Sequence, residues 1–186
     1  QVEVYRGPQS TLSGRAALAG AVYVKTKDPV FEREAKVQST VGTMDTVGGA
    51  FMGNTPVLDD QIALRISGEY ETSENDINYP DYESFDRYNE FSEDEYYQLR
   101  GKLLVQPNAM PDTSGLLTYS FSHDSPNVLD VAGPGLGFDY GDKRGDFNLP
   151  VFSEARTAET HNLSFELTHD VNSALTFISL TTYSGT

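Results

Sequence analysis

The stretch Gln61-Ile-Ala-Leu-Arg-Ile-Ser-Gly-Glu-Tyr70 decides the class of fold. Apolar and polar residues alternate along it, which places Ile62, Leu64, Ile66 and Tyr70 on one face and Gln61, Arg65, Ser67 and Glu69 on the other. This alternation is typical of a β-strand whose two faces meet different surroundings. We therefore expect a β-strand here and look for the same pattern elsewhere.

The alternation recurs on both sides of this stretch. It is clear again at residues 97–105 and 161–168, and weaker at 36–44, 46–54, 116–122 and 174–183. A helix with Leu99 and Leu103 on one face would contain Gly101, a poor helix former, and would end before Pro107. The pattern predicts seven strands and an all-β fold.

The connections between these strands differ in length. Short ones are expected at Met44-Asp45-Thr46 and at residues 56–60, 107–115 and 169–173, and long polar ones at 72–94 and 123–159. From the second hairpin onward, short and long connections alternate. An antiparallel up-and-down meander with its long loops at one end is typical of a transmembrane β-barrel, whose tilted strands need about 9 to 11 residues.

Aromatic residues gather toward the long-loop end of the predicted strands. They are Tyr70, Tyr96, Tyr97, Tyr119 and Phe121. Aromatic side chains form girdles where a membrane barrel meets the lipid headgroups. We expect these five to form the outer girdle.

Composition excludes several classes of function. The net charge of -15 argues against nucleic acid as a partner, because binding phosphates requires a basic surface. The absence of cysteine excludes a disulfide framework, a thiolate metal site and a cysteine nucleophile within these 186 residues. The longest run without charged or strongly polar residues, 16–24, is far shorter than the roughly 20 residues of a membrane helix. Any membrane contact must therefore use β-structure.

The amino-terminal stretch has a different character. Two short β-branched runs, Val2 with Val4 and Val22 with Val24, flank a segment that contains Gly7-Pro8, Gly14 and Gly20. This predicts two strands joined by an irregular connection. No Gly-Lys-Ser/Thr ending follows, so a phosphate-binding loop is not indicated. A plain surface turn is the simple alternative.

This stretch resembles the last part of the plug domain of TonB-dependent outer-membrane receptors. The residues that carry the resemblance are Glu3-Val4-Tyr5-Arg6-Gly7-Pro8-Gln9-Ser10, Gly14-Arg15, Ala19-Gly20-Ala21 and Lys25-Thr26-Lys27-Asp28-Pro29. The resemblance implies that residues 1–31 are the carboxyl-terminal part of a plug and that 32–186 begin the barrel. Such barrels have about 22 strands around a filled lumen. Seven strands cannot close one, and Gln1 follows neither a methionine nor a signal sequence, so we expect a piece of a larger receptor.

The resemblance also implies a function. Receptors of this family import scarce ligands across the bacterial outer membrane, and TonB, energised through ExbB and ExbD, displaces the plug. A ferric siderophore is the default ligand, and vitamin B12 and oligosaccharides stay open. The TonB-binding segment would lie upstream of Gln1, and neither a cofactor nor bond chemistry is expected.

The plug motif supplies the first set of candidate residues. They are Glu3, Val4, Arg6, Gly7, Pro8, Gly14 and Gly20. The resemblance implies that Arg6 pairs with carboxylates on the inner barrel wall, and an ordinary exposed arginine is the alternative. We expect the glycines to serve backbone geometry.

The predicted loop at 71–95 supplies a second set, because acidic and aromatic residues alternate along it. The candidates for ligand contact are Asp76, Tyr79, Asp81, Tyr82, Phe85 and Tyr88. An extracellular loop of this kind could help capture ligand, or bind divalent cations together with lipopolysaccharide, because hard cations prefer carboxylate oxygens. A solvated acidic loop is the alternative.

No catalytic constellation is visible. Ser122-His123-Asp124 is contiguous, whereas a catalytic triad brings its members together from separate places, and neither a Gly-x-Ser-x-Gly elbow nor a His-Glu-x-x-His helix occurs. The remaining alternative to a transporter is a soluble β-sandwich that binds carbohydrate. In that fold the apolar strand faces would pack on each other, and the protein would need no detergent.

Overall fold

The computed structural model describes residues 2–7, 20–74, 92–127, 129–131, 150–152 and 156–186. Its main body is one seven-stranded sheet in the order β11-β10-β7-β6-β5-β4-β3, in which every neighbouring pair is antiparallel. The strands are β3 (Glu34–Val41), β4 (Val47–Leu58), β5 (Ile62–Glu74), β6 (Glu93–Val105), β7 (Thr113–Ser125), β10 (Ala158–Asn172) and β11 (Leu175–Gly185). This confirms the all-β fold and the seven predicted strands.

Two small hairpins accompany the sheet. β1 (Val2–Arg6) pairs with β2 (Gly20–Val24), as the two β-branched runs predicted. β8 (Leu129–Val131) pairs with β9 (Pro150–Phe152) within the segment that the sequence predicted as a long loop. Three-residue strands without a clear alternation leave no readable pattern, which is why they were not predicted.

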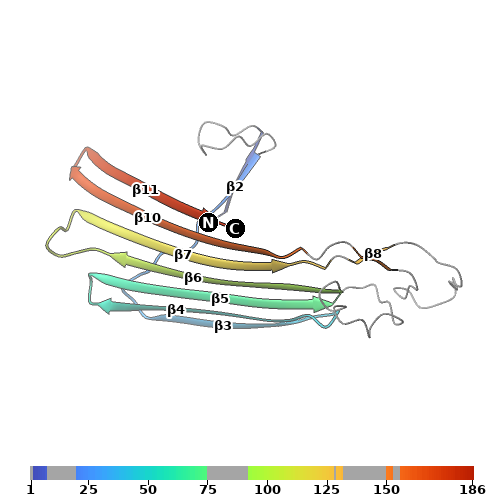
Figure 1. Ribbon diagram of the computed structural model, residues 1–186. Helices are drawn as coiled ribbons and strands as arrows, with labels where there is room; N and C mark the ends of the chain where they lie inside the picture. The colour runs from blue at the N-terminus through green and yellow to red at the C-terminus, as the bar shows by residue number, and fades with distance from the viewer. Residues whose placement is uncertain (1, 8–19, 75–91, 128, 132–149, 153–155) are drawn as a thin grey trace, which may run out of the picture.

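The sheet is a curved trough with different connections at its two ends (Figure 1). The turns at 59–61, 106–112 and 173–174 lie at one end, on the left of the figure, and the chain enters β3 from that end. The last residues of β5 and β7 and the first residues of β6 and β10 lie at the other end, together with the tight turn at 42–46. The predicted alternation of short and long connections is therefore present.

The tight turn between β3 and β4 has positive φ at Met44 and Asp45, 59° and 46°. Two successive residues with positive φ match the right-handed twist of the flanking strands. The backbone N–H of Gly42 donates to the carbonyl of Thr46 over 3.0 Å and closes the hairpin.

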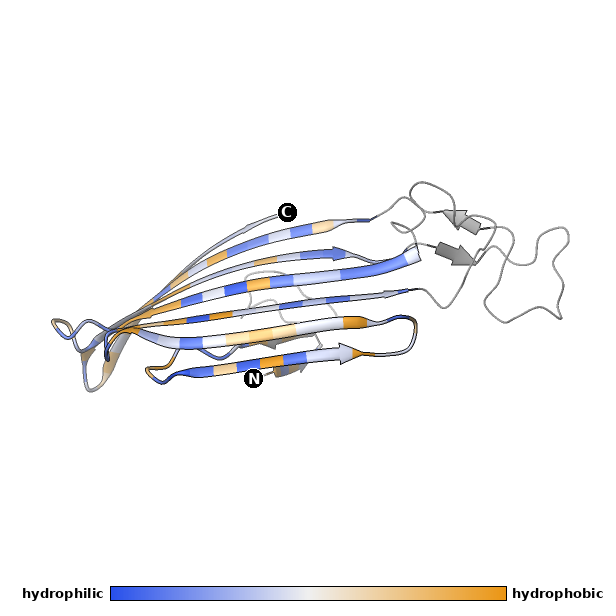
Figure 2. Ribbon diagram, turned by 90° about the horizontal axis from the view of Figure 1, so that it is seen from below, coloured by the Kyte–Doolittle hydropathy of each residue, from blue (hydrophilic) through white to orange (hydrophobic). Residues whose placement is uncertain are grey.

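Burial in the sheet is inverted relative to a water-soluble protein. Among the described residues, the only buried hydrophobic side chain is that of Ala63, whereas Asn54 and Lys102 are 3% and 7% exposed. Large apolar side chains stand exposed on one face, including Leu99, Leu117 and Phe165. Hydrophobic and hydrophilic residues alternate along each strand (Figure 2). An apolar outer face and a polar inner face are typical of a barrel wall in lipid.

Part of the predicted aromatic girdle is wrong. Tyr70, Tyr97, Tyr119 and Phe121 are on the apolar face, because each pairs across the ladder with other residues of that face. Tyr96 instead pairs with Glu71 and Asp124 on the polar face. Adjacent residues of a strand point to opposite faces, so Tyr96 and Tyr97 cannot both face lipid.

Candidate functional site

The polar inner face of the sheet is the candidate functional site. One row of it, taken straight across the strands, consists of Glu34, Asn54, Arg65, Lys102, Thr118, Ser164 and Thr182. Four of these seven side chains belong to the half of the row formed by β3 to β6, and three of those four are charged. The segment that precedes β3, residues 25–33, crosses over this charged half and contacts it.

Asn54 holds the backbone of this segment. Its side-chain amide accepts a hydrogen bond from the Val30 N–H over 3.1 Å, and donates to the carbonyls of Val30 and Glu32 over 2.7 and 2.5 Å. The amide thus pairs with a peptide chain much as another backbone would. Because Asn54 is only 3% exposed, water competes little for these three bonds.

Glu34 bridges two cations. Its carboxylate accepts from Lys27 Nζ at 2.7 and 3.0 Å and from Arg65 Nη1 at 3.0 Å. The Arg65 side chain is 11% exposed and that of Lys27 is 58% exposed, so one arm of the bridge is shielded and the other is open to solvent. The shielded pair of Glu34 with Arg65 joins β3 to β5 beneath the segment. The exposed pair of Glu34 with Lys27 adds little to stability, as is usual for exposed pairs.

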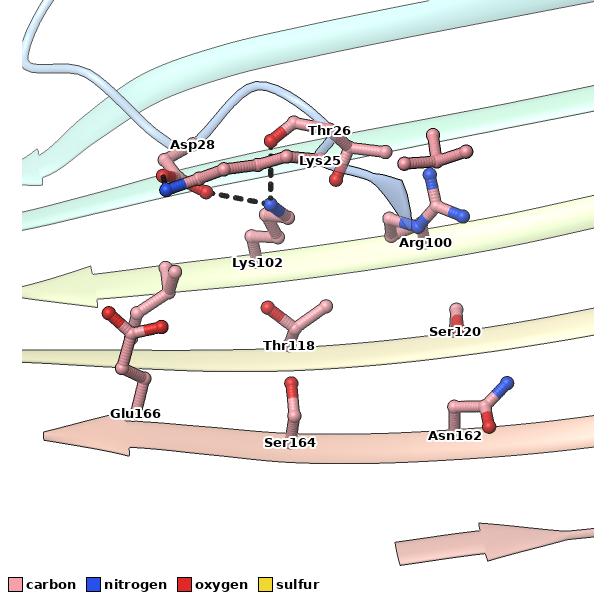
Figure 3. Close-up of a pocket in the computed structure, with 12 residues that line it drawn as sticks. Lys25, Thr26, Asp28, Arg100, Lys102, Thr118, Ser120, Asn162, Ser164 and Glu166 are labelled. Atoms are coloured by element: carbon pink, nitrogen blue, oxygen red, sulfur yellow. Dashed lines mark hydrogen bonds and ion pairs between the residues drawn. The ribbon is translucent and has the colours of Figure 1, made fainter. Parts of the chain in front are cut away.

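Lys102 provides the third contact. Its Nζ donates to Asp28 Oδ1 over 2.7 Å and to the Thr26 carbonyl over 3.1 Å, as the dashed lines of Figure 3 show. The lysine side chain is 8% exposed, and the Asp28 side chain is 36% exposed. A nearly buried ammonium needs such partners, because removing it from water without them is costly.

A hollow of about 510 Å³ lies beside these contacts. Val24, Lys25, Thr26 and Asp28 line it on the side of the segment. The side chains of the sheet that line it are Arg100, Lys102, Leu116, Thr118, Ser120, Asn162, Ser164 and Glu166. Apart from Leu116 its floor is polar and suits the passage or binding of a polar molecule.

The outer, apolar face of the sheet carries a cluster of aromatic side chains. The ring of Tyr97 stacks on that of His123, with centroids 4.5 Å apart, and Phe121 lies 4.8 Å from His161. A hydrogen bond of 2.9 Å joins the Tyr119 hydroxyl and His161 Nδ1. Histidine and tyrosine rings with both apolar and polar parts suit the boundary between lipid and water.

The described part of the plug motif lies in and just after the β1–β2 hairpin. Glu3 and Val4 are in β1, and the Tyr5 hydroxyl donates to Glu3 Oε2 over 2.9 Å. Gly7 and Gly20 have positive φ, 89° and 144°, and a Cβ at Gly20 would stand 2.4 Å from the Tyr5 carbonyl oxygen. These two glycines do serve backbone geometry.

Arg6 has no ion pair with any other described residue. It is exposed at the end of β1, so its pairing with the barrel wall stays a prediction. Pro8, Gly14 and the loop candidates Asp76, Tyr79, Asp81, Tyr82, Phe85 and Tyr88 lie outside the described residues.

The residues that make the inner contacts were not predicted as a site. The alternation placed Arg65 and Lys102 on the polar face, but nothing local showed that residues 26–32 return to them. Asn54 was placed at the end of a strand, before a turn at 56–60, whereas β4 continues to Leu58. An asparagine in the interior of a strand would have been a usable signal for this contact.

In the part of the chain that the structure describes, no helix is long and apolar enough to span a membrane. In the same part of the chain, no group of three or more histidine, cysteine, aspartate or glutamate side chains could hold a metal ion.

Comparison with known proteins finds relatives in one family, although no protein-family model matches the chain. A probable TonB-dependent receptor of Bordetella pertussis, BfrD, is 39% identical over 67 residues, which are 36% of this chain and 9% of that protein. The ferrioxamine receptor of Yersinia enterocolitica is 29% identical over 150 residues, 80% of this chain and 19% of that protein. FpvA of P. aeruginosa, solved with an iron-pyoverdine complex, superposes with a TM-score of 0.75 at 16% identity, over 98% of this chain and 23% of that one.

In sequence the chain resembles TonB-dependent and ferrioxamine receptors, and it has the fold of the corresponding part of FpvA. The chain spans less than a fifth of the length of either curated relative. This likeness places the chain in the bacterial outer membrane, where the exposed apolar face of the sheet meets lipid. The relatives named here are receptors and none is named as an enzyme.

Proposed function

We propose that this chain is part of a receptor that imports a ferric siderophore across the outer membrane. In this proposal residues 1–31 are the last part of the plug, and 32–186 form the first part of the barrel. The observation that carries it is the inverted burial of the sheet, whose polar inner face holds the segment before β3 through Asn54, Glu34 and Lys102. A wall with lipid on one side and a docked segment on the other is the arrangement a plugged barrel requires.

The ligand class comes from relatives. Ferrioxamine receptors and an iron-pyoverdine complex are among the proteins that this chain resembles. Vitamin B12 and oligosaccharides are the other ligands to test. The chain itself carries out no bond chemistry in this proposal.

The proposed mechanism has two stages. Ligand binds at the extracellular side, between the loops and the plug, and the acidic and aromatic residues 76–88 contribute to that surface. The alternative role of these residues is to bind divalent cations alongside lipopolysaccharide. TonB, driven through ExbB and ExbD, then pulls on a part of the receptor beyond this chain and displaces the plug. The hollow on the inner wall marks where plug and wall are not tightly packed.

The soluble sandwich has less support. In a sandwich the apolar faces of two sheets pack on each other. Among the described residues no second sheet covers the apolar face, on which Val37, Leu99 and Leu163 are exposed. No observation favours a carbohydrate-binding module over a receptor.

The test is uptake by the intact receptor that contains this chain. It would be expressed in a strain that lacks its own siderophore receptors, and supplied with ferrioxamine B loaded with radioactive iron. We expect accumulation of iron that disappears when TonB is deleted. Uptake of labelled vitamin B12 or oligosaccharide in place of iron would show that the receptor has a different ligand. A protein that purifies from the soluble fraction would contradict the proposal.

A further inference from the structure

The inner face of the sheet has two chemically different parts. On β5 and β6, four of the six side chains in three successive rows are charged, in the pairs Glu69 with Gln98, Ser67 with Arg100, and Arg65 with Lys102. On β7 and β10, none of the six side chains in the same rows is charged, in the pairs Ser122 with Thr160, Ser120 with Asn162, and Thr118 with Ser164. These last six residues, called here the neutral strip, offer only hydroxyl and amide groups.

The charged half of the inner face holds the segment before β3. Lys102 donates to Asp28 over 2.7 Å, and Arg65 donates to Glu34 over 3.0 Å. The side chains of Lys102 and Arg65 are 8% and 11% exposed. Charges of this half therefore form ion pairs that fix the chain to the wall.

The hollow of about 510 Å³ lies over the neutral strip. Thr118, Ser120, Asn162 and Ser164 line it, side by side on β7 and β10 in Figure 3. Its volume lies in the range of about 300 to 1,000 Å³ that is usual for sites of drug-sized ligands. The pair of Ser122 with Thr160 continues the strip toward the long-loop end, so the strip runs about 14 Å along the strands.

A surface along which a solute moves must bind it weakly and at many places, so that it can both enter and leave. Hydroxyl and amide groups donate and accept hydrogen bonds and carry no fixed charge. A charged side chain binds an opposite charge more strongly, above all where water is partly excluded. The neutral strip meets the requirement for passage better than the charged half does.

We propose that the ferric complex moves inward along the neutral strip, in contact with β7 and β10, and not over the charged half. This rests on the proposed function, because it names the part of the wall that the imported ligand touches. The ligand that suits the strip has oxygen atoms on its outer surface and little net charge, which is the chemistry of a ferric hydroxamate. Hydroxyls of successive rows donate to these oxygens in turn.

Cysteine variants of the intact receptor test which part of the wall is used. Ser164→Cys places a thiol on the neutral strip, and Ser67→Cys places one on the charged half, beside Arg100. Thr182→Cys is the matched control, because Thr182 is the direct neighbour of Ser164 on β11 and is not among the residues that line the hollow. Serine and cysteine are similar in size, so we expect the variants to fold.

Each thiol is then modified with a reagent that attaches a benzyl group through a disulfide, and mass spectrometry confirms the modification. This chain contains no cysteine of its own, and the unmodified receptor given the same reagent controls for cysteines elsewhere. Initial uptake of iron-loaded ferrioxamine B is measured before the reagent, after it, and again after a reductant removes the benzyl group. Binding of the same complex to cells without TonB is measured in parallel.

Modification at 164 should lower uptake by about tenfold or more, because the added ring fills part of the passage, and the reductant should restore it. Binding to cells without TonB should stay unchanged, which separates passage from capture. Modification at 182 or 67 should leave uptake unchanged.

Three results would overturn the proposal. One is full uptake after modification at 164. Another is a loss at 182 or 67 as large as that at 164, which would show no preference for the neutral strip. The third is a thiol at 164 that the reagent cannot reach, because the hollow would then be filled in the intact receptor. Failure of the proposed function looks different, since uptake would not depend on TonB even before the reagent is added.

Discussion

At the scale of single residues, Asn54 does most to hold the segment that precedes β3. Its amide makes three hydrogen bonds to backbone groups more than twenty positions earlier in the chain, at Val30 and Glu32. Those groups lie outside the strand ladder and have no strand partner of their own. A side chain therefore completes the backbone hydrogen bonding that a neighbouring strand would otherwise supply.

Replacing Asn54 with alanine should destabilise the receptor. The change leaves the Val30 N–H and two carbonyls without these partners, which costs about 2 to 3 kcal/mol. The measurement is denaturant unfolding of the receptor in lipid vesicles. Thr55→Ala is the matched control, since Thr55 is the next residue, exposed on the outer face, and should change stability by less than about 0.5 kcal/mol. Equal effects of the two substitutions would contradict the role of Asn54.

The pair of Lys102 and Asp28 makes an asymmetric prediction. Asp28→Asn leaves a nearly buried ammonium short of its carboxylate, whereas Lys102→Met leaves a carboxylate that is partly exposed. We expect Asp28→Asn to cost about 1 to 2 kcal/mol, less than a fully buried pair because water reaches Asp28. Adding Lys102→Met to Asp28→Asn should recover part of that loss. A double-mutant cycle in unfolding free energy measures this, and strictly additive effects would show that the two residues do not interact.

At the scale of elements, the central strands are longer than the lipid core requires. β5, β6 and β7 each contain 13 residues, more than the roughly 9 to 11 that span the hydrocarbon core. The extra residues extend the sheet beyond the lipid at the long-loop end, where Tyr96 on the inner face and Tyr97 on the outer face are neighbours. The strands therefore serve both as wall and as support for the loops.

Glycines on the outer face differ in what surrounds them, which gives a prediction for β5 and β6. A Cβ at Gly68 would lie 2.6 Å from Cε1 of Phe51, whose ring covers it, whereas a Cβ at Gly101 would meet nothing within 4 Å. Gly68→Val should displace the Phe51 ring and cost about 1 to 3 kcal/mol. Gly101→Val should be neutral or slightly stabilising, because β-branched residues suit strands.

The thermal unfolding of the two variants in detergent decides this point. Heat-dependent mobility on a gel, or circular dichroism, would report the difference. A Gly68→Val protein as stable as Gly101→Val would mean that the Phe51 ring moves aside without loss, and that its position over the glycine contributes nothing to β4 and β5.

At the scale of the whole molecule, the two faces of the sheet meet different media. Leu163 and Asn162 are neighbours on β10, with Leu163 among the lipid-facing side chains and Asn162 lining the hollow. Leu163→Arg should lower the stability of the inserted receptor by about 2 to 4 kcal/mol, as charges do near the middle of a barrel's lipid face. Asn162→Arg, the matched control, places the same charge on the polar side.

Folding of the intact receptor into lipid vesicles measures this difference. We expect the folded fraction to fall with Leu163→Arg and to stay close to that of the unmodified receptor with Asn162→Arg. The reverse order would mean that the assignment of the two faces is wrong, and would also remove the main support for placing the chain in a barrel wall.

The local pattern of residues determined the sheet. Alternation at period two specified the seven strands and, for Arg65, Lys102 and Leu163, the correct face, because a side chain's face depends only on its position along the strand. For Tyr96 the prediction was wrong, because it grouped aromatic residues by their nearness to the long loops and not by the face each occupies. The family resemblance of the first residues was also visible in the sequence, because its glycines and short strands stand close together in the chain.

Only the tertiary structure decided what the inner face holds. Contacts such as Asn54 with Val30, Arg65 with Glu34 and Lys102 with Asp28 join positions 24 to 74 residues apart. No local pattern specifies such pairs, because they depend on how the ladder aligns four strands into one row and on where the preceding segment crosses it. The sequence therefore determined which residues face inward, and the register of the sheet determined that they meet the segment that precedes β3.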